Sequence, residues 1–228
     1  MIADFLCRLT EKKEVAPTIW FLRFTLPANP KLEFLPGQYL LLKVGEAYRQ
    51  YSIASSNHNH DYFDLYIEYF PGGLASEFFM KLEVGETAPF KGPAGIFVYR
   101  DTPLDKVFLA TGTGVAPIRS MIESALERGT SQKLMLYFGV RSQKDLYLQE
   151  EFQQLAEKYK NFDYMLCFSQ EDPSIVAEHV GVGRIPAVLD PKFDVYKDYE
   201  FYVCGGPKAV VGLKEYLQEK QIPKERVI

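Results

Sequence analysis

The sequence predicts two domains of different construction: an antiparallel β-barrel of Greek-key type in residues 1–101, then an α/β domain with a parallel sheet in residues 102–228. In the first hundred residues, short apolar and aromatic runs are separated by Pro and Gly, which is typical of a small barrel. From about Asp105 onward, apolar runs alternate with amphipathic segments, which indicates βαβ units. At 47% hydrophobic residues in a chain of 228, each domain can bury a core.

The barrel strands are predicted from runs of β-branched and aromatic residues. They are expected at residues 18–26, 39–44 and 63–70. The pair Pro36-Gly37 and the run Pro71-Gly72-Gly73 interrupt this pattern and predict turns. One helix, at residues 74–82, is expected directly after the second of these turns.

The second domain is predicted from the alternation of strand and helix patterns. Strands are expected at residues 106–110, 134–139, 163–169 and 200–204, and helices at 116–128, 148–159 and 208–218. The clearest helix carries Ile118, Met121, Ile122 and Ala125 on one face, the spacing of an amphipathic helix.

Composition excludes several classes of protein. The net charge of −4 gives no reason to expect nucleic acid or an anionic membrane as partner. Cys7, Cys167 and Cys204 are far apart, which excludes a disulfide framework and an iron–sulfur cluster held by this chain alone. No run approaches the about 20 apolar residues of a membrane span, and residues 1–10 do not resemble a signal peptide. A cytoplasmic protein without a bound metal is expected.

Residues Arg49-Gln50-Tyr51-Ser52 are the first candidate for chemistry. A bound flavin needs a flat partner for its ring, a hydrogen-bonding group near N5 and a cation for its phosphates, and Tyr, Ser and Arg supply these. On a strand, Arg49 and Tyr51 share one face while Ser52 lies on the other. The alternative is an ordinary strand end with a surface Arg and a core Tyr.

Two glycine-rich turns, each followed by a helix, are candidate phosphate sites. Residues 71–77 place Ser76 in the first turn of a helix, where free amide groups bind phosphate; a pyrophosphate there would indicate FAD rather than FMN. Residues 111–117 place Gly112-Thr113-Gly114 at the carboxyl end of a parallel strand, with Pro117 in the first turn of the next helix. A simple capped turn is the alternative for the first segment.

Cys204-Gly205 ends the last predicted strand and places a thiol at the carboxyl edge of the sheet. A buried, unreactive Cys is the alternative. A nucleophilic Cys is disfavoured because none of the three histidines forms a recognisable pair with it. His58 and His60 lie in what reads as a solvated loop.

Together these four segments, in this order, resemble the ferredoxin–NADP reductase family of FAD- and NAD(P)-binding oxidoreductases, over nearly the whole chain. The resemblance implies hydride transfer between NADH or NADPH and FAD, with electrons passed to a separate ferredoxin, flavodoxin or oxygenase component. Tyr51 would stack on the flavin, Ser52 would approach N5, and Cys204 would lie beside the nicotinamide; these are the implied catalytic residues.

The resemblance also implies a set of cofactor-binding residues. For FAD they are Arg49, Gln50, Tyr51, Ser52, Tyr66, Ile67, Glu68, Gly73, Leu74, Ala75 and Ser76. For the nicotinamide dinucleotide they are Gly112, Thr113, Gly114, Pro117, Arg141, Ser169, Gln170, Cys204 and Gly205.

The choice of nicotinamide cofactor is predicted from a departure from the family. NADP-specific members often carry Ser-Arg where this chain has Ser169-Gln170, followed by Glu171 and Asp172. Two carboxylates would repel a 2′-phosphate, whereas an acid can accept a bond from a ribose hydroxyl, so the sequence favours NADH. Arg141 could still serve a phosphate.

Two other functions stay open: a reductase that binds free flavin as a substrate, and an electron-transfer subunit active only in a larger complex.

Overall fold

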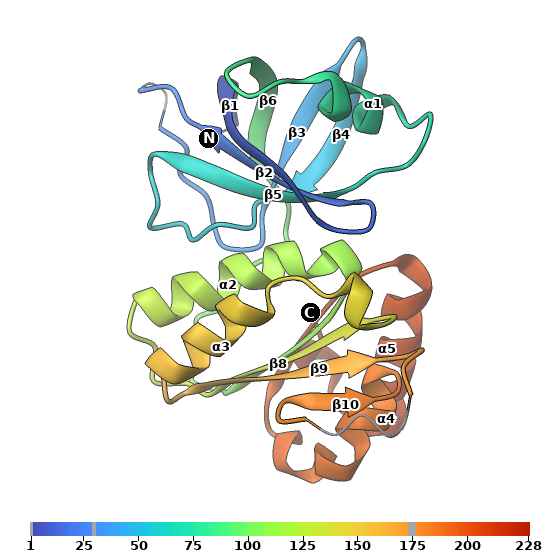
Figure 1. Ribbon diagram of the computed structural model, residues 1–228. Coiled ribbons are helices and arrows are strands. Elements are labelled where there is room, and N and C mark those ends of the chain that lie inside the picture. The colour runs from blue at the N-terminus through green and yellow to red at the C-terminus, as the bar shows by residue number, and fades with distance from the viewer. Residues whose placement is uncertain (1, 29–30, 173–176) are drawn as a thin grey trace. The chain divides into compact units, whose positions relative to one another are not determined.

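The computed structural model describes residues 2–28, 31–172 and 177–228 (Figure 1). Two compact units make up the chain. Unit 1 comprises Met1–Arg100 and Ala116–Arg128, and unit 2 comprises Asp101–Val115 and Gly129–Ile228. The predicted fold class is confirmed, because an antiparallel sheet is followed by a parallel α/β sheet. The domain boundary between residues 101 and 102 stays a prediction.

Unit 1 is built on a six-stranded antiparallel sheet in the order β4-β3-β6-β1-β2-β5. The strands are β1 (Ala3–Ala16), β2 (Ile19–Thr25), β3 (Tyr39–Val44), β4 (Ala47–Ser52), β5 (Tyr62–Glu68) and β6 (Thr87–Ala94). Strand β6 contains Pro89, Gly92 and Pro93, residues that usually argue against a strand interior, so it was not among the strands predicted individually.

The sheet curls so that its two outer strands approach each other. Ala54, two residues beyond β4, donates its amide to the Asp64 carbonyl of β5 at 2.8 Å. The interior of the curled sheet holds a cluster of aromatic rings, in which Phe24 lies 5.0 Å from Phe90 and 5.4 Å from Phe63 between ring centroids. The predicted barrel core is therefore present.

Two helices belong wholly or mainly to unit 1. Helix α1 (Leu74–Lys81) begins where the sequence predicts and buries Phe79 among the barrel aromatics. Helix α2 (Val115–Glu127) carries the predicted apolar face, and Ile118, Met121 and Ile122 are fully buried. Pro117 is its third residue, in the first turn as expected.

Unit 2 is built on a five-stranded parallel sheet in the order β10-β9-β8-β7-β11. Its strands are β7 (Lys106–Thr111), β8 (Leu134–Val140), β9 (Phe162–Phe168), β10 (Val180–Val182) and β11 (Glu200–Cys204). The helices are α3 (Gln149–Lys158), α4 (Ile185–Leu189) and α5 (Pro207–Glu219), with short 3₁₀ turns at Gly112–Gly114, Gln143–Asp145, Asp190–Tyr196 and Lys224–Arg226.

Helices cover both faces of the parallel sheet (Figure 1). Phe152 of α3 packs against Phe138 and Tyr164 on one face. Leu189 of α4 and Leu217 of α5 belong to the core cluster on the other face. Because both faces are buried, the strands are nearly continuous apolar runs, as the sequence suggests.

In the part of the chain that the structure describes, every helix is too short or too polar to cross a bilayer.

Candidate functional site

Strand β4 presents the first predicted flavin residues in unit 1. Arg49 is exposed, and its guanidinium donates to the Tyr48 carbonyl at 3.0 Å. Tyr51 is half-buried, with its ring edge-on to Phe79 at 5.0 Å between centroids. Burial raises the pKa of the Tyr51 phenol to about 12, so the ring is neutral at physiological pH. Arg49 is thus free to reach an anion, while Tyr51 is held in place by packing.

Strand β5 supplies the next predicted group. Ile67 is 2% exposed and belongs to the barrel core, and Tyr66 is buried with its ring 5.4 Å from that of Phe21. Glu68 is exposed. The side chains of Tyr66 and Ile67 are therefore committed to packing, and the Glu68 side chain is the one that faces solvent.

The N-terminus of α1 fits a phosphate. The N-cap residue is Gly73, which has no side chain to cap the helix, and among the described residues no side chain caps this end. The first-turn amides of Leu74, Ala75 and Ser76 are therefore available to an anion. A Cβ on Gly73 would lie 3.0 Å from the Phe70 carbonyl oxygen, a tight contact that favours glycine here. The Ser76 hydroxyl accepts from the Phe70 amide at 3.1 Å and so closes the turn.

Glu77 is an acid in the first turn of α1, where it would repel a phosphate unless it were held aside. Its carboxylate accepts from the Tyr69 hydroxyl at 3.0 Å and from the Gly72 amide at 3.2 Å. These two bonds place its charge on the turn that precedes the helix. The hydrogen bond from Tyr69 to this carboxylate also raises the pKa of the Tyr69 phenol.

In unit 2, the structure brings together the two glycine segments of the predicted nicotinamide site. Strands β7 and β11 are parallel neighbours, and Cys204 pairs with Ala110. A Cβ on Gly114 would lie 2.5 Å from the Gly205 Cα, so the two turns are in backbone contact. Gly112 has a φ of +52°, and within the described part of the chain a Cβ there would have open space. This open turn at the carboxyl ends of parallel strands fits a dinucleotide phosphate.

Cys204 is half-buried at this edge of the sheet. Burial raises the pKa of its thiol, although a hydrogen bond from the Gly205 backbone partly opposes the shift. A thiol that stays protonated is a poor nucleophile, so the geometry favours a positioning contact over covalent chemistry.

The residues predicted to choose between NADH and NADPH lie together at the ends of β8 and β9. The Gln170 amide donates to the Arg141 carbonyl at 2.8 Å, and the Ser169 amide donates to the Val140 carbonyl at 3.1 Å. The Glu171 carboxylate accepts from the Gln143 amide at 2.8 Å. A carboxylate therefore lies at the ends of these two strands.

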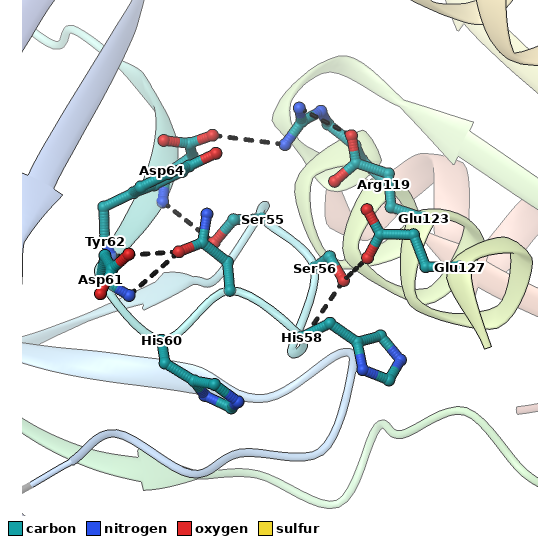
Figure 2. Close-up of a pocket in the computed structure, with 11 residues that line it drawn as sticks. Ser55, Ser56, His58, His60, Asp61, Tyr62, Asp64, Arg119, Glu123 and Glu127 are labelled. Carbon is teal, nitrogen blue, oxygen red and sulfur yellow. Dashed lines mark hydrogen bonds and ion pairs between the residues drawn. The ribbon is translucent and has the colours of Figure 1, made fainter.

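One pocket, of about 720 Å³, lies within unit 1 (Figure 2). None of the residues predicted to bind FAD or the nicotinamide dinucleotide lines it. It is lined by Ser55, Ser56, His58, Asn59, His60, Asp61, Tyr62, Asp64, Arg119, Glu123 and Glu127. His58 and His60 are exposed on its loop, as expected. Among the residues that the structure describes, no group of three His, Cys, Asp or Glu side chains is placed to hold a metal.

The charged side chains of this pocket bind one another. Asp64 is 1% exposed and accepts from Arg23 at 2.7 and 2.9 Å, and Arg119 lies 3.5 Å from the same carboxylate. Arg119 also donates to the Ala54 carbonyl at 2.8 Å and pairs with Glu123 at 2.8 Å. The network joins α2, β2, β5 and the segment after β4. No sequence pattern predicts this network, because its members are charged residues far apart in the chain.

Comparisons with known proteins agree with this architecture. Residues 6–99 match the oxidoreductase FAD-binding domain family, and residues 108–214 match the oxidoreductase NAD-binding domain family. The chain is 35% identical over 176 residues to ferredoxin–NADP reductase B of Sorangium cellulosum, covering 75% of this chain and 72% of that protein. It is 32% identical over 195 residues to the toluate 1,2-dioxygenase electron transfer component of Pseudomonas putida, covering 84% of this chain and 56% of that protein.

A similar solved structure is that of a cytochrome P450 reductase from Amycolatopsis, with a TM-score of 0.89 and 25% identity over 99% of this chain and 68% of that one. The chain spans only 56% to 65% of the length of several curated relatives it matches.

The fold and the two family matches show a chain that joins an oxidoreductase FAD-binding domain to an oxidoreductase NAD-binding domain. The chain belongs to the ferredoxin–NADP reductase family. The predicted family and the predicted cofactors, FAD with NADH or NADPH, are confirmed at this level.

Proposed function

We propose that this chain is an FAD-containing reductase that takes hydride from NADH or NADPH and delivers electrons to a separate carrier such as a ferredoxin, a flavodoxin or an oxygenase component. The observation that supports the proposal is the pair of glycine-rich turns that each lead into a helix, one at the N-terminus of α1 and one at Gly112–Gly114. When bound, FAD supplies the chemistry of accepting a hydride and releasing electrons singly. The protein supplies positioning.

The proposed residue roles divide between the two units. In unit 1, Arg49 and the first-turn amides of α1 hold the FAD pyrophosphate, Tyr51 packs on the flavin, and Ser52 offers a hydroxyl near N5. In unit 2, Gly112, Thr113 and Gly114 hold the dinucleotide phosphates, and Cys204 with Gly205 orients the nicotinamide. Gln50, Tyr66, Ile67, Glu68 and Gly73 complete the flavin site, and Pro117, Arg141, Ser169 and Gln170 complete the nucleotide site.

The proposal of a separate carrier rests on cysteine count and on relatives. Three cysteines are fewer than a cysteine-ligated iron–sulfur cluster requires, so such a cluster would lie outside these 228 residues. One relative is named as the electron transfer component of a dioxygenase and another as a ferredoxin–NADP reductase. NADH is the proposed donor because the Glu171 carboxylate, at the ends of β8 and β9, would repel a 2′-phosphate bound there. A cytoplasmic location is proposed with it.

The test is electron delivery by the purified protein reconstituted with FAD. We expect NADH-dependent reduction of ferricyanide and of an added ferredoxin, with FAD retained through gel filtration. If FAD is lost in gel filtration and leaves the enzyme in reduced form at each turnover, the protein is a free-flavin reductase instead. If FAD is retained but neither acceptor is reduced, the protein is a subunit that requires a larger complex.

A further inference from the structure

Lys12 lies at the C-terminal end of α1, although it is 67 residues earlier in the sequence than the first residue it binds there. Its ammonium donates to the carbonyls of Phe79 at 2.9 Å, Met80 at 2.8 Å and Leu82 at 3.0 Å. The same ammonium lies 5.6 Å from the centroid of the Trp20 ring on β2. All three donor positions of the side chain are therefore used on one helix end.

Helix α1 needs such a donor because its own end satisfies few of its carbonyls. The last carbonyls of any helix lack intrahelical partners. Here the C-cap residue is Leu82 in an extended conformation rather than a left-handed glycine, and its amide satisfies only Phe78. Lys12 binds the next two carbonyls in the sequence. Its positive charge also faces the negative end of the helix dipole.

The opposite end of this helix is the proposed pyrophosphate site. With eight residues, α1 has just over two turns. Displacement or fraying of one end therefore shifts the backbone amides at the other end. Phe79, in the middle, fixes the rotation of the helix by packing against Tyr51 and Phe24. Lys12 fixes the remaining freedom, which is the position of the helix along its axis.

We propose that Lys12 is a positioning residue for FAD: by holding the C-terminal end of α1 to β1, it sets where the first-turn amides of Leu74, Ala75 and Ser76 meet the pyrophosphate. This inference rests on the proposed function of α1 as the FAD phosphate site. Lys12 itself touches the helix and Trp20, and its role is therefore indirect.

The test compares Lys12→Met with the matched control Lys13→Met, since Lys13 is the exposed neighbour on the same strand. Binding of FAD and of riboflavin to the apoprotein is titrated by flavin fluorescence, at a temperature well below both melting transitions. Riboflavin carries the ring but no phosphate, so it reports on the rest of the site. Lys12→Met should weaken FAD binding about tenfold, the scale of a partly buried charge at a helix end. Riboflavin binding should be unchanged, and Lys12→Arg should recover part of the FAD affinity.

The possible outcomes distinguish a failure of the proposed Lys12 role from a failure of the proposed FAD-dependent function. A wild-type protein that does not bind FAD would overturn the proposed function itself. A wild type that binds FAD, with Lys12→Met equal to Lys13→Met, would overturn only the role of Lys12. A Lys12→Met protein that melts earlier but binds FAD normally, or that loses FAD and riboflavin equally, would reduce Lys12 to a stabilising residue and overturn the inference as well.

Discussion

Gly114 and Gly205 are in backbone contact, so that a Cβ on Gly114 would lie 2.5 Å from the Gly205 Cα. Their contact joins the turn after β7 to the turn after β11, the two segments from which the proposed nicotinamide site is built. Real Cβ atoms do not approach other atoms so closely, and the obstacle is backbone rather than a flexible side chain. One of the two turns must move if Gly114 gains a methyl group.

Gly114→Ala should therefore weaken NADH binding at least about tenfold, because it separates the two turns, while FAD, bound in unit 1, is retained. Calorimetric titration of the FAD-loaded protein with NAD⁺ measures the effect; NAD⁺ replaces NADH because it carries the same phosphates and cannot reduce the FAD. Gly206→Ala is the matched control, since within the described residues no atom lies within 4 Å of a Cβ there. Equal affinity in the two variants would contradict the proposed site.

Arg49→Ala should loosen FAD about 10- to 100-fold, which is the cost of losing a charged hydrogen bond to phosphate. Lys43→Ala is the control, because it removes an exposed positive charge from the adjacent strand β3. Fluorescence titration of the apoproteins gives both affinities. If the two variants bind FAD equally, Arg49 is an ordinary surface residue.

Cys204→Ala should leave FAD bound but slow reduction by NADH about tenfold, since the nicotinamide loses a positioning contact. Single-turnover reduction of the bound FAD measures the rate. Because burial raises the pKa of the Cys204 thiol, the rate should show no step from thiol ionisation between pH 6 and about 8. If the Cys204→Ala protein releases FAD, the thiol belongs to the FAD site, and its proposed role beside the nicotinamide is wrong.

Asp64→Asn should destabilise unit 1 by about 3 kcal/mol, because it removes the buried carboxylate that Arg23 and Arg119 share and leaves Glu123 as the carboxylate beside Arg119. Urea denaturation of the apoprotein measures the change in unfolding free energy. Asp61→Asn, on the exposed rim of the same pocket, should change it little. An effect of Asp64→Asn no larger than that of Asp61→Asn would contradict the prediction.

The unfolding free energy should fall as the pH rises above about 9. Burial raises the pKa values of Cys7 and Cys167 to about 12 from 9.0. The unfolded thiols therefore ionise first, and the stability present below pH 9 is lost on the way to pH 12. Each thiol should contribute a loss of about 1.4 kcal/mol per pH unit in that window. The Cys7→Ala/Cys167→Ala double variant should show a shallower decline, and an unchanged slope would contradict the assignment.

The sequence predicted the parts of the fold that follow from local patterns. Strands β3 and β11 begin and end where expected, because both are apolar runs bounded by turn residues. Strand β6 was harder, since its prolines and Gly92 weaken the strand pattern and only pairing with β1 and β3 makes it a strand. Lys12 and Asp64 could not be predicted as partners of α1 and α2, because their contacts depend on tertiary geometry between residues far apart in the sequence.

The central claim, that this chain moves hydride from a nicotinamide to FAD, is tested most directly by anaerobic stopped-flow reduction of the FAD-loaded protein with NADH and, separately, with NADPH. The account predicts rapid loss of the yellow flavin absorbance with NADH and much slower loss with NADPH, because Glu171 disfavours a 2′-phosphate. Rapid bleaching by NADPH alone would contradict the assignment of cofactor preference. A flavin that stays oxidised with both donors would contradict the central claim.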